Sequence, residues 1–95
     1  MDKRKIERMK KKIAGLQREL AALGPLMRGS IVRIGTRNKQ FYFSLNKDKK
    51  TRLIYLGERR EPLARRYSRN YQRLLAIVEE MTLINMELLK NDAGL

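Results

Sequence analysis

Two heptad seams of apolar residues, one on each side of a β-prone block, restrict most strongly how this chain can fold. In the first seam the spacing alternates between three and four, through Ile6, Met9, Ile13, Leu16, Leu20 and Leu23. This spacing places the apolar side chains on one stripe of a helix. We therefore expect a helix over residues 3–23. Gly24-Pro25 should end it, because glycine accepts the left-handed conformation after a helix and proline cannot continue one.

A second and longer seam occupies the last third of the chain. It runs through Leu63, Tyr67, Asn70, Leu74, Ile77, Met81, Ile84 and Leu88. This pattern predicts a helix over residues 61–90, with Pro62 in its first turn, and it includes Asn70, a polar residue of the kind that can set register or partner number. A further stripe lies beside the seam: Tyr71, Leu75, Val78, Thr82, Asn85 and Leu89. One partner helix cannot cover both stripes, so we expect a homodimer.

The block between the seams, residues 30–57, favours β-structure. Three short runs, 31–34, 40–45 and 51–56, are separated by polar segments that contain Gly, Asn or Asp. This pattern predicts a three-stranded antiparallel meander. Strand alternation should direct Phe41, Phe43 and Leu45 to the core and Tyr42 away from it.

The expected fold is therefore a single α+β domain over residues 1–95. It consists of a long helix, a three-stranded antiparallel β-meander and a second long helix. We expect the helices to pair antiparallel as a coiled coil and to dimerise into a helical bundle.

The composition argues against catalysis. The chain of 95 residues has no cysteine and no histidine, which excludes disulfides, cysteine-based metal sites and the commonest general base. The serines have no histidine to activate them and the carboxylates are scattered. We expect no enzyme activity, no metal, no cofactor and no small-molecule substrate. No apolar run approaches the ~20 residues that span a bilayer, and the N-terminus is too basic for a secretory signal, so we expect a cytoplasmic protein.

The formal net charge of +13 calls for a polyanionic partner. Residues 1–12 carry +5 and residues 76–95 carry −3, and antiparallel helices would bring these segments side by side and let them neutralise each other. Residues 28–75 are different, because fourteen Lys and Arg face only three acids, for +11. We expect this uncompensated segment to bind the phosphates of nucleic acid.

The predicted interface combines turn, strand and helix cations. Four arginines of the second helix lie within about a third of its circumference. We expect them to form a basic ridge, which consists of Arg65, Arg66, Arg69 and Arg73. Arg33, Arg52 or turn residues are candidates for reading bases. The complete predicted nucleic-acid-binding set is Arg28, Arg33, Arg37, Lys39, Lys47, Lys49, Lys50, Arg52, Arg59, Arg60, Arg65, Arg66, Arg69 and Arg73.

The favoured function is that of a DNA-binding accessory or regulatory protein, with RNA as the less favoured nucleic acid. An exposed Tyr42 or Tyr55 could stack on an unpaired base, and a sheet face could enter a DNA major groove. The main alternative is a coiled-coil adaptor or inhibitor whose basic face docks an acidic protein. A third reading is attachment of the first helix to a membrane surface.

Six segments of the chain, spread over most of the sequence beyond residue 20, resemble a family of small bacterial and archaeal domains of unknown function, often encoded near mobile-element genes. They are residues 23–25, 27–31, 41–45, 50–56, 70–75 and 84–89. Typical members carry a cysteine cluster between the Arg-Gly-Ser segment and the aromatic strand. Residues 33–40 of this chain have no cysteine, so any metal role of the family is absent here. The resemblance implies a mobile-element, viral or plasmid setting and supplies no established activity.

Overall fold

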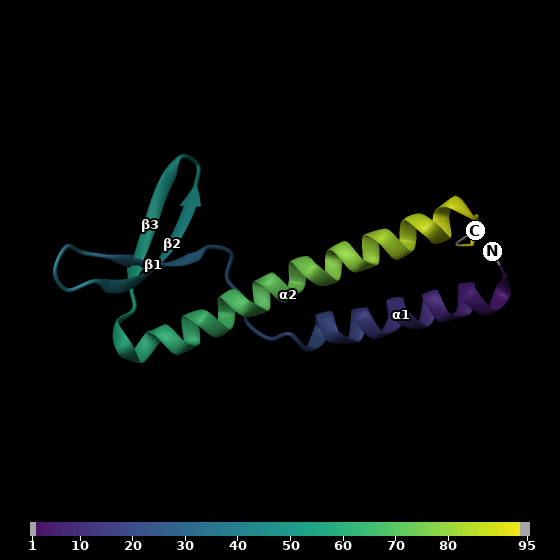
Figure 1. Ribbon diagram of the computed structural model, residues 1–95, viewed down its shortest axis with the longest axis horizontal. Coiled ribbons are helices and arrows are strands. Elements are labelled where there is room, and N and C mark those ends of the chain that lie inside the picture. The colour runs from purple at the N-terminus through teal and green to yellow at the C-terminus, as the bar shows by residue number, and fades with distance from the viewer. Residues whose placement is uncertain (1, 94–95) are drawn as a thin grey trace. The chain divides into compact units, whose positions relative to one another are not determined.

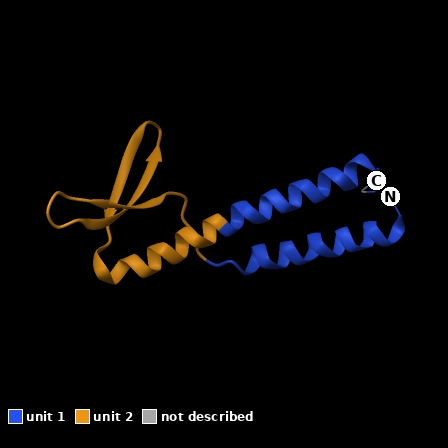
Figure 2. Cartoon of the chain, in the orientation of Figure 1, with its two compact units in different colours: residues 1–24, 73–95 blue, residues 25–72 orange. Residues whose placement is uncertain are grey.

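The computed structural model describes residues 2–93 and confirms the order helix, three-stranded antiparallel sheet, long helix (Figure 1). Its elements are α1 (Lys3–Ala22), β1 (Ser30–Ile34), β2 (Gln40–Lys47), β3 (Lys50–Tyr55) and α2 (Gly57–Lys90). The chain divides into two compact units (Figure 2). We call residues 1–24 and 73–95 the helical unit, and residues 25–72 the sheet unit. Helix α2 contributes to both.

In the helical unit, α1 and the second half of α2 run antiparallel (Figure 1). Helix α1 begins after Asp2, whose Oδ1 accepts a hydrogen bond of 2.8 Å from the backbone N of Lys5. It ends before Gly24, which adopts the expected left-handed conformation with φ +80°. The seam residues Leu16 and Ile77 are buried, Ile77 completely. The heptad spacing therefore marks the packed face of this unit.

In the sheet unit the strands follow one another in the order β1-β2-β3, each antiparallel to its neighbour. Asp48 and Lys49 alone form the turn between β2 and β3, and both have positive φ, +53° and +61°. Two such residues make the turn whose twist matches that of a hairpin. β1 and β2 are therefore longer than the sequence pattern predicted, β3 has the predicted length but begins one residue earlier, and this turn is shorter.

The core of the sheet unit lies between the sheet and the first half of α2. Phe43, Leu56 and Ala64 are buried, and the partly buried apolar residues packed around them are Met27, Ile31, Phe41 and Leu45. This confirms the predicted core-facing residues of β2. On the opposite face Tyr42 packs edge to face against Tyr55, with 5.5 Å between ring centroids.

Gly29 allows the chain to pass close to this core. Its φ is +147°, and a Cβ atom there would lie 2.6 Å from Cζ of Phe43 and 2.6 Å from the carbonyl oxygen of Ser44. Only glycine fits such a position without displacing its neighbours. The backbone at Gly29 therefore packs directly against the ring of Phe43.

Helix α2 begins at Gly57, four residues before the predicted start. Pro62 consequently lies in the second turn, where its missing N–H leaves one helical hydrogen bond unmade. The seam also shifts in this half of the helix, because Ala64 is buried and Leu63 is 47% exposed.

Asn70 has a different role from the one predicted for a seam residue. Its Nδ2 donates a hydrogen bond of 2.7 Å to the carbonyl oxygen of Pro25. Nearby, the backbone N of Met27 donates to the carbonyl oxygen of Tyr67 at 3.2 Å. Asn70 thus fastens the segment that follows Pro25 onto α2 within the sheet unit.

Candidate nucleic-acid interface

The charge of the chain follows its division into units. The sheet unit holds thirteen Lys and Arg against three acids and so carries +10 of the net +13. The helical unit holds ten against seven, for +3. Within residues 25–72 the structure contains one ion pair, between Nε of Arg65 and Oε1 of Glu61 at 2.7 Å. Most cations of the sheet unit therefore have no carboxylate partner.

The strand cations all lie on one face of the sheet. The register places Arg52 opposite Leu45 and Arg33 opposite Phe41, and residues opposite each other in an antiparallel pair share a face. The face that carries Phe43 thus also carries Arg33, Lys47, Lys50 and Arg52. The other face has no charged strand residue and carries Val32, Ile34, Tyr42, Leu53 and Tyr55. Tyr42 and Tyr55 therefore do not lie among the strand arginines.

A polar groove of about 410 Å³ runs between the start of β1 and α2. It is lined by Gly29, Ser30, Ile31, Arg65, Ser68, Arg69 and Gln72. The guanidinium carbons of Arg33 and Arg65 each lie 5.3 Å from the centroid of the Phe41 ring, an arrangement in which the aromatic ring attracts both cations. Glu61 binds only Nε of Arg65, so both Nη atoms remain able to donate. Hydroxyl, amide and guanidinium donors converge in this groove, and no carboxylate lines it.

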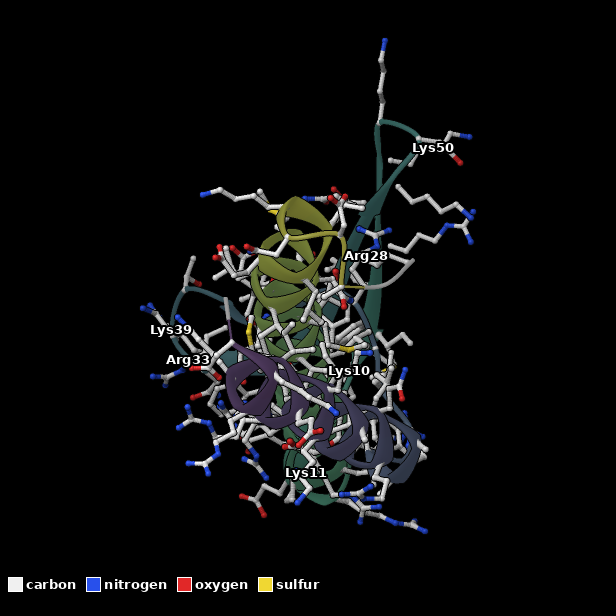
Figure 3. The ribbon with its side chains drawn as sticks, turned by 90° about the vertical axis from the view of Figure 1, so that its right-hand side faces the viewer. Lys10, Lys11, Arg28, Arg33, Lys39 and Lys50 are labelled. Atoms are coloured by element: carbon white, nitrogen blue, oxygen red, sulfur yellow. The ribbon has the colours of Figure 1, made fainter. Side chains whose placement is uncertain are left out.

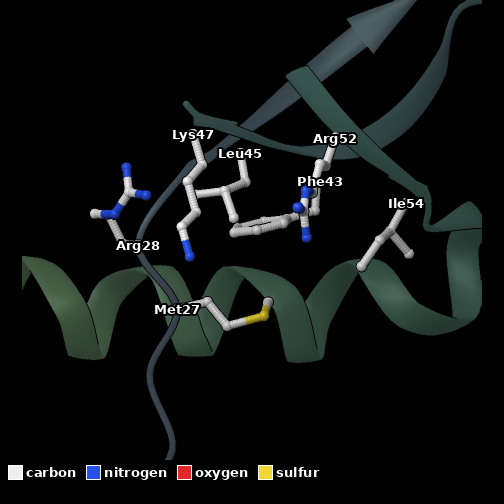
Figure 4. Close-up of a pocket in the computed structure, with 7 residues that line it drawn as sticks. All are labelled: Met27, Arg28, Phe43, Leu45, Lys47, Arg52 and Ile54. Carbon is white, nitrogen blue, oxygen red and sulfur yellow. The ribbon is translucent and has the colours of Figure 1, made fainter. Parts of the chain in front are cut away.

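A second recess, of about 510 Å³, lies on the β3 side of the core. Its floor is apolar, formed by Met27, Phe43, Leu45 and Ile54. Its rim is cationic, formed by Arg28, Lys47 and Arg52 (Figure 4). We call it the β3 pocket. The sequence pattern did not indicate it, although Leu45 and Arg52 belong to predicted strands whose pairing register would have placed them together.

The predicted cations of the sheet unit do not form one flat patch (Figure 3), although those of the strands share one face. Lys50 extends from the β2–β3 hairpin, whereas Arg33 and Lys39 lie together on another side (Figure 3). Arg60 donates from Nη1 to the carbonyl oxygen of Tyr55 at 3.2 Å. The loop between β1 and β2, the hairpin turn and the exposed side of α2 supply the others: Arg37, Lys39, Lys49, Arg59, Arg60 and Arg66.

Arg73 is the first residue of α2 that belongs to the helical unit, one helical turn after Arg69. Its Nε and Nη2 donate to the two carboxylate oxygens of Glu19, the latter at 2.8 Å. Its Nη1 also lies 3.6 Å from Oε1 of Glu80. The hydrogen bond from Arg73 lowers the pKa of Glu19, and that to Glu19 raises the pKa of Arg73. Arg73 therefore joins α1 to α2, and the basic ridge of the sheet unit consists of Arg65, Arg66 and Arg69.

The predicted neutralisation between the two ends of the helices does not take the form of ion pairs. Among residues 2–93 no salt bridge links the lysine-rich start of α1 with the acidic end of α2. The ion pair between the helices is instead that of Glu19 with Arg73. The basic face of α1 thus remains exposed to solvent.

Two further observations concern the described residues as a whole. No group of three acidic side chains within residues 2–93 is placed to hold a metal ion. No helix in that range is long and apolar enough to cross a membrane. Comparison with protein-family models, curated proteins and solved structures finds no match to this chain.

Proposed function

We propose that this chain binds nucleic acid through its sheet unit, DNA in preference to RNA, as an accessory or regulatory protein. The observation that carries the proposal is the charge of that unit, +10 on residues 25–72, with one internal ion pair. A compact unit with this excess repels itself, and a phosphate backbone removes that repulsion. The resemblance noted for the sequence suggests a mobile element, virus or plasmid as the setting.

The polar groove supports phosphate contact in particular. Arg65 and Arg69 lie in the lining of this groove together with Ser30, Ser68 and Gln72. One arginine side chain can donate two parallel hydrogen bonds to two oxygens of the same phosphate. These bonds are shorter and stronger than those of neutral donors. Such contacts fix the position of a duplex or strand without reading its sequence.

The salt dependence of a double variant tests this proposal. Arg65→Ala combined with Arg69→Ala should reduce the slope of log Kd against log salt concentration by about two, one for each lost phosphate contact. The measurement is fluorescence anisotropy with duplex DNA, single-stranded DNA and RNA, with circular dichroism to check the fold. The matched control, Lys10→Ala with Lys11→Ala, removes the same charge from the helical unit. Equal losses in both double variants would refute the groove, and absence of binding at low salt would refute the function.

We also propose that a second copy of the chain covers the apolar stripe of α2. Leu75, Val78 and Leu89 are 45%, 49% and 70% exposed. Between them, the hydroxyl of Thr82 donates to the carbonyl oxygen of Val78 at 2.7 Å, which satisfies its polar atom within the helix. Exposed apolar stripes of this kind are covered when helices assemble into bundles, and the two copies would then present two sheet units.

Sedimentation velocity tests the dimer. Val78→Asp should give monomers because it would bury a carboxylate at the interface between copies. Ala76→Asp adds the same charge at an exposed position of α2 outside the stripe and should leave the assembly unchanged. A wild-type chain that sediments as a monomer at high concentration would contradict the dimer.

The uncharged outer face of the sheet favours one alternative function. Leu53 and Tyr55 are 49% and 50% exposed there, and exposed apolar groups of this kind also occur where proteins dock. In this alternative the chain is an adaptor that binds a partner protein through this apolar outer face, in addition to or instead of the basic face that the sequence suggested for an acidic partner. Leu53→Gln, which changes no charge, would then abolish capture of that partner and leave nucleic-acid affinity unchanged.

A further inference from the structure

The β3 pocket is not explained by phosphate binding alone, because its floor is apolar. We propose that it receives one unpaired nucleobase of a single strand, while the adjoining phosphates bind the cations of its rim. The proposal rests on the function proposed above and specifies it further. The sheet unit would distinguish single-stranded from duplex nucleic acid by whether a base is free to enter.

The pocket is built by the sheet and the segment before β1. Phe43 is paired with Ile54 across β2 and β3, and Leu45 is paired with Arg52, so all four side chains face the same way. Met27 closes the side toward α2 (Figure 4). Ile54 is 52% exposed although it faces the core side. The apolar core thus continues into an open surface of the size of a small-molecule site, about 300–1,000 Å³.

The rim supplies positive charge on two sides of this surface. Arg28 and Lys47 lie on one side of the pocket and Arg52 on the other (Figure 4). Nη1 of Arg28 donates to the carbonyl oxygen of Asn46 at 3.3 Å, which holds that guanidinium beside β2. No acidic residue lines the pocket. Two cationic sides separated by an apolar floor match a nucleotide within a strand, whose sugar is flanked by a 5′ and a 3′ phosphate while its base projects to one side.

The chemistry of the rim selects among the possible occupants. A second copy of the chain would bring more positive charge to a rim that already carries three cations. A duplex hides the faces of its bases, so it offers nothing to the apolar floor. An unpaired base offers a flat face to the apolar side chains and to the planar guanidinium of Arg52. An acidic amphipathic peptide shares the charge, but it lacks the continuous row of phosphates that the other cations of the sheet unit would bind.

The experiment compares three fluorescent probes with equal backbone chemistry, using the full chain. The first is oligothymidylate of about ten nucleotides, the second is the same strand with every base removed, and the third is a duplex of equal length. Binding should weaken about 5- to 150-fold when the bases are removed, the factor that stacking of one base provides. The abasic strand keeps its phosphates and should still bind with strong salt dependence.

Two variants, at adjacent residues of β3, test whether the affinity gained from the bases arises in this pocket. Ile54→Thr removes apolar surface from the pocket, and threonine suits a strand. The matched control is Leu53→Thr, because Leu53 is 49% exposed and points to the opposite face of the sheet. Ile54→Thr should remove most of the advantage of bases over abasic strand and leave duplex affinity unchanged. Leu53→Thr should change neither.

A second measurement uses the unmodified sequence and needs no stable variant. Methyl resonances of Met27 and Ile54 should shift when oligothymidylate is added and should not shift with the abasic strand, whereas those of Leu53 should respond to neither. Equal affinity for oligothymidylate and abasic strand, or methyl shifts at Leu53 alone, would overturn the pocket while nucleic-acid binding survives. If the methyl resonances of Met27 and Ile54 shifted on addition of an acidic peptide but not on addition of oligothymidylate, the pocket would be a site for a protein ligand, and the proposed base site would be overturned. Failure of all three probes to bind would instead refute the proposed function itself.

Discussion

Alanine substitution at Gly15 and at Gly29 should change stability in opposite directions, although the chemical change is the same. Gly15 lies inside α1, where an added Cβ atom would meet only Nη2 of Arg18, at 3.8 Å. Alanine in a helix interior is more favourable than glycine by about 0.5–1 kcal/mol. We therefore expect Gly15→Ala to raise the free energy of unfolding by that amount.

Gly29→Ala should be destabilising for two separate reasons. The φ of +147° is strained for any residue with a side chain, a penalty of about 1–3 kcal/mol. The Cβ atom would also lie 2.6 Å from Cζ of Phe43 and from the backbone oxygen of Ser44, and overpacking of this kind costs about 1–3 kcal/mol. The expected loss is at least about 2 kcal/mol, or about 8 °C or more in Tm for a chain of this size.

Thermal and urea unfolding monitored by far-ultraviolet circular dichroism measures both changes. The near-ultraviolet signal of the tyrosines in the sheet unit should fall earlier in Gly29→Ala than in the wild type. A Gly29→Ala variant within about 0.5 kcal/mol of wild type would refute the close passage of the chain against the Phe43 ring. A destabilised Gly15→Ala variant would refute a regular, unobstructed helix at that position of α1.

Three further outcomes follow from the same structure. Ile77→Ala should lower the free energy of unfolding by about 2–5 kcal/mol, because Ile77 is completely buried, whereas Leu83→Ala, at a position 58% exposed, should change it by under about 0.5 kcal/mol. The carboxyl group of Glu19 should titrate below its ordinary pKa of 4.5, owing to its hydrogen bond from Arg73; its stabilising contribution is then complete above pH 4.5 and is lost as the pH falls through the lowered pKa. In the Arg73→Gln variant the pKa of Glu19, measured by NMR titration, should return toward 4.5. An unchanged pKa would show that the hydrogen bond from Arg73 is not what lowers it. Asn70→Ala should cost about 0.5–1.5 kcal/mol in urea unfolding through the lost hydrogen bond to backbone; an unchanged midpoint would contradict it.

Periodicity explains why the elements could be predicted from the sequence. The seam of α1 and the alternation around Phe43 each depend on a single repeat, 3.5 residues in the helix and two in the strand, and both describe the structure. The start of α2 does not depend on a repeat. It is set by Gly57, whose left-handed φ of +62° turns the chain from β3 into the helix. Pro62 is the more familiar signal for a helix start, and it indicated a start four residues too late.

The candidate site shows a different limit. The excess of positive charge in the middle of the chain is visible from composition, but the pairing of Arg73 is not, because Glu19 lies 54 positions away in the sequence. Asn70 likewise gains its role from the backbone of Pro25, 45 positions away. The β3 pocket depends on strand register and on how much of the sheet α2 leaves uncovered. These are properties of assembled elements, and single residues do not reveal them.

The sheet unit is a continuous segment of the chain, whereas the helical unit consists of two segments that are distant in sequence. This difference has a consequence for folding during synthesis. Residues 25–72 form the sheet unit as one uninterrupted segment, whereas the helical unit needs residues 73–95 to meet residues 1–24. On the ribosome, which adds residues from the N-terminus onward, the cationic sheet unit is translated in full before α1 obtains its antiparallel partner. The sheet unit, with its excess of positive charge, would therefore be able to fold first, and the pairing of residues 1–24 with residues 73–95 would be the last step of folding.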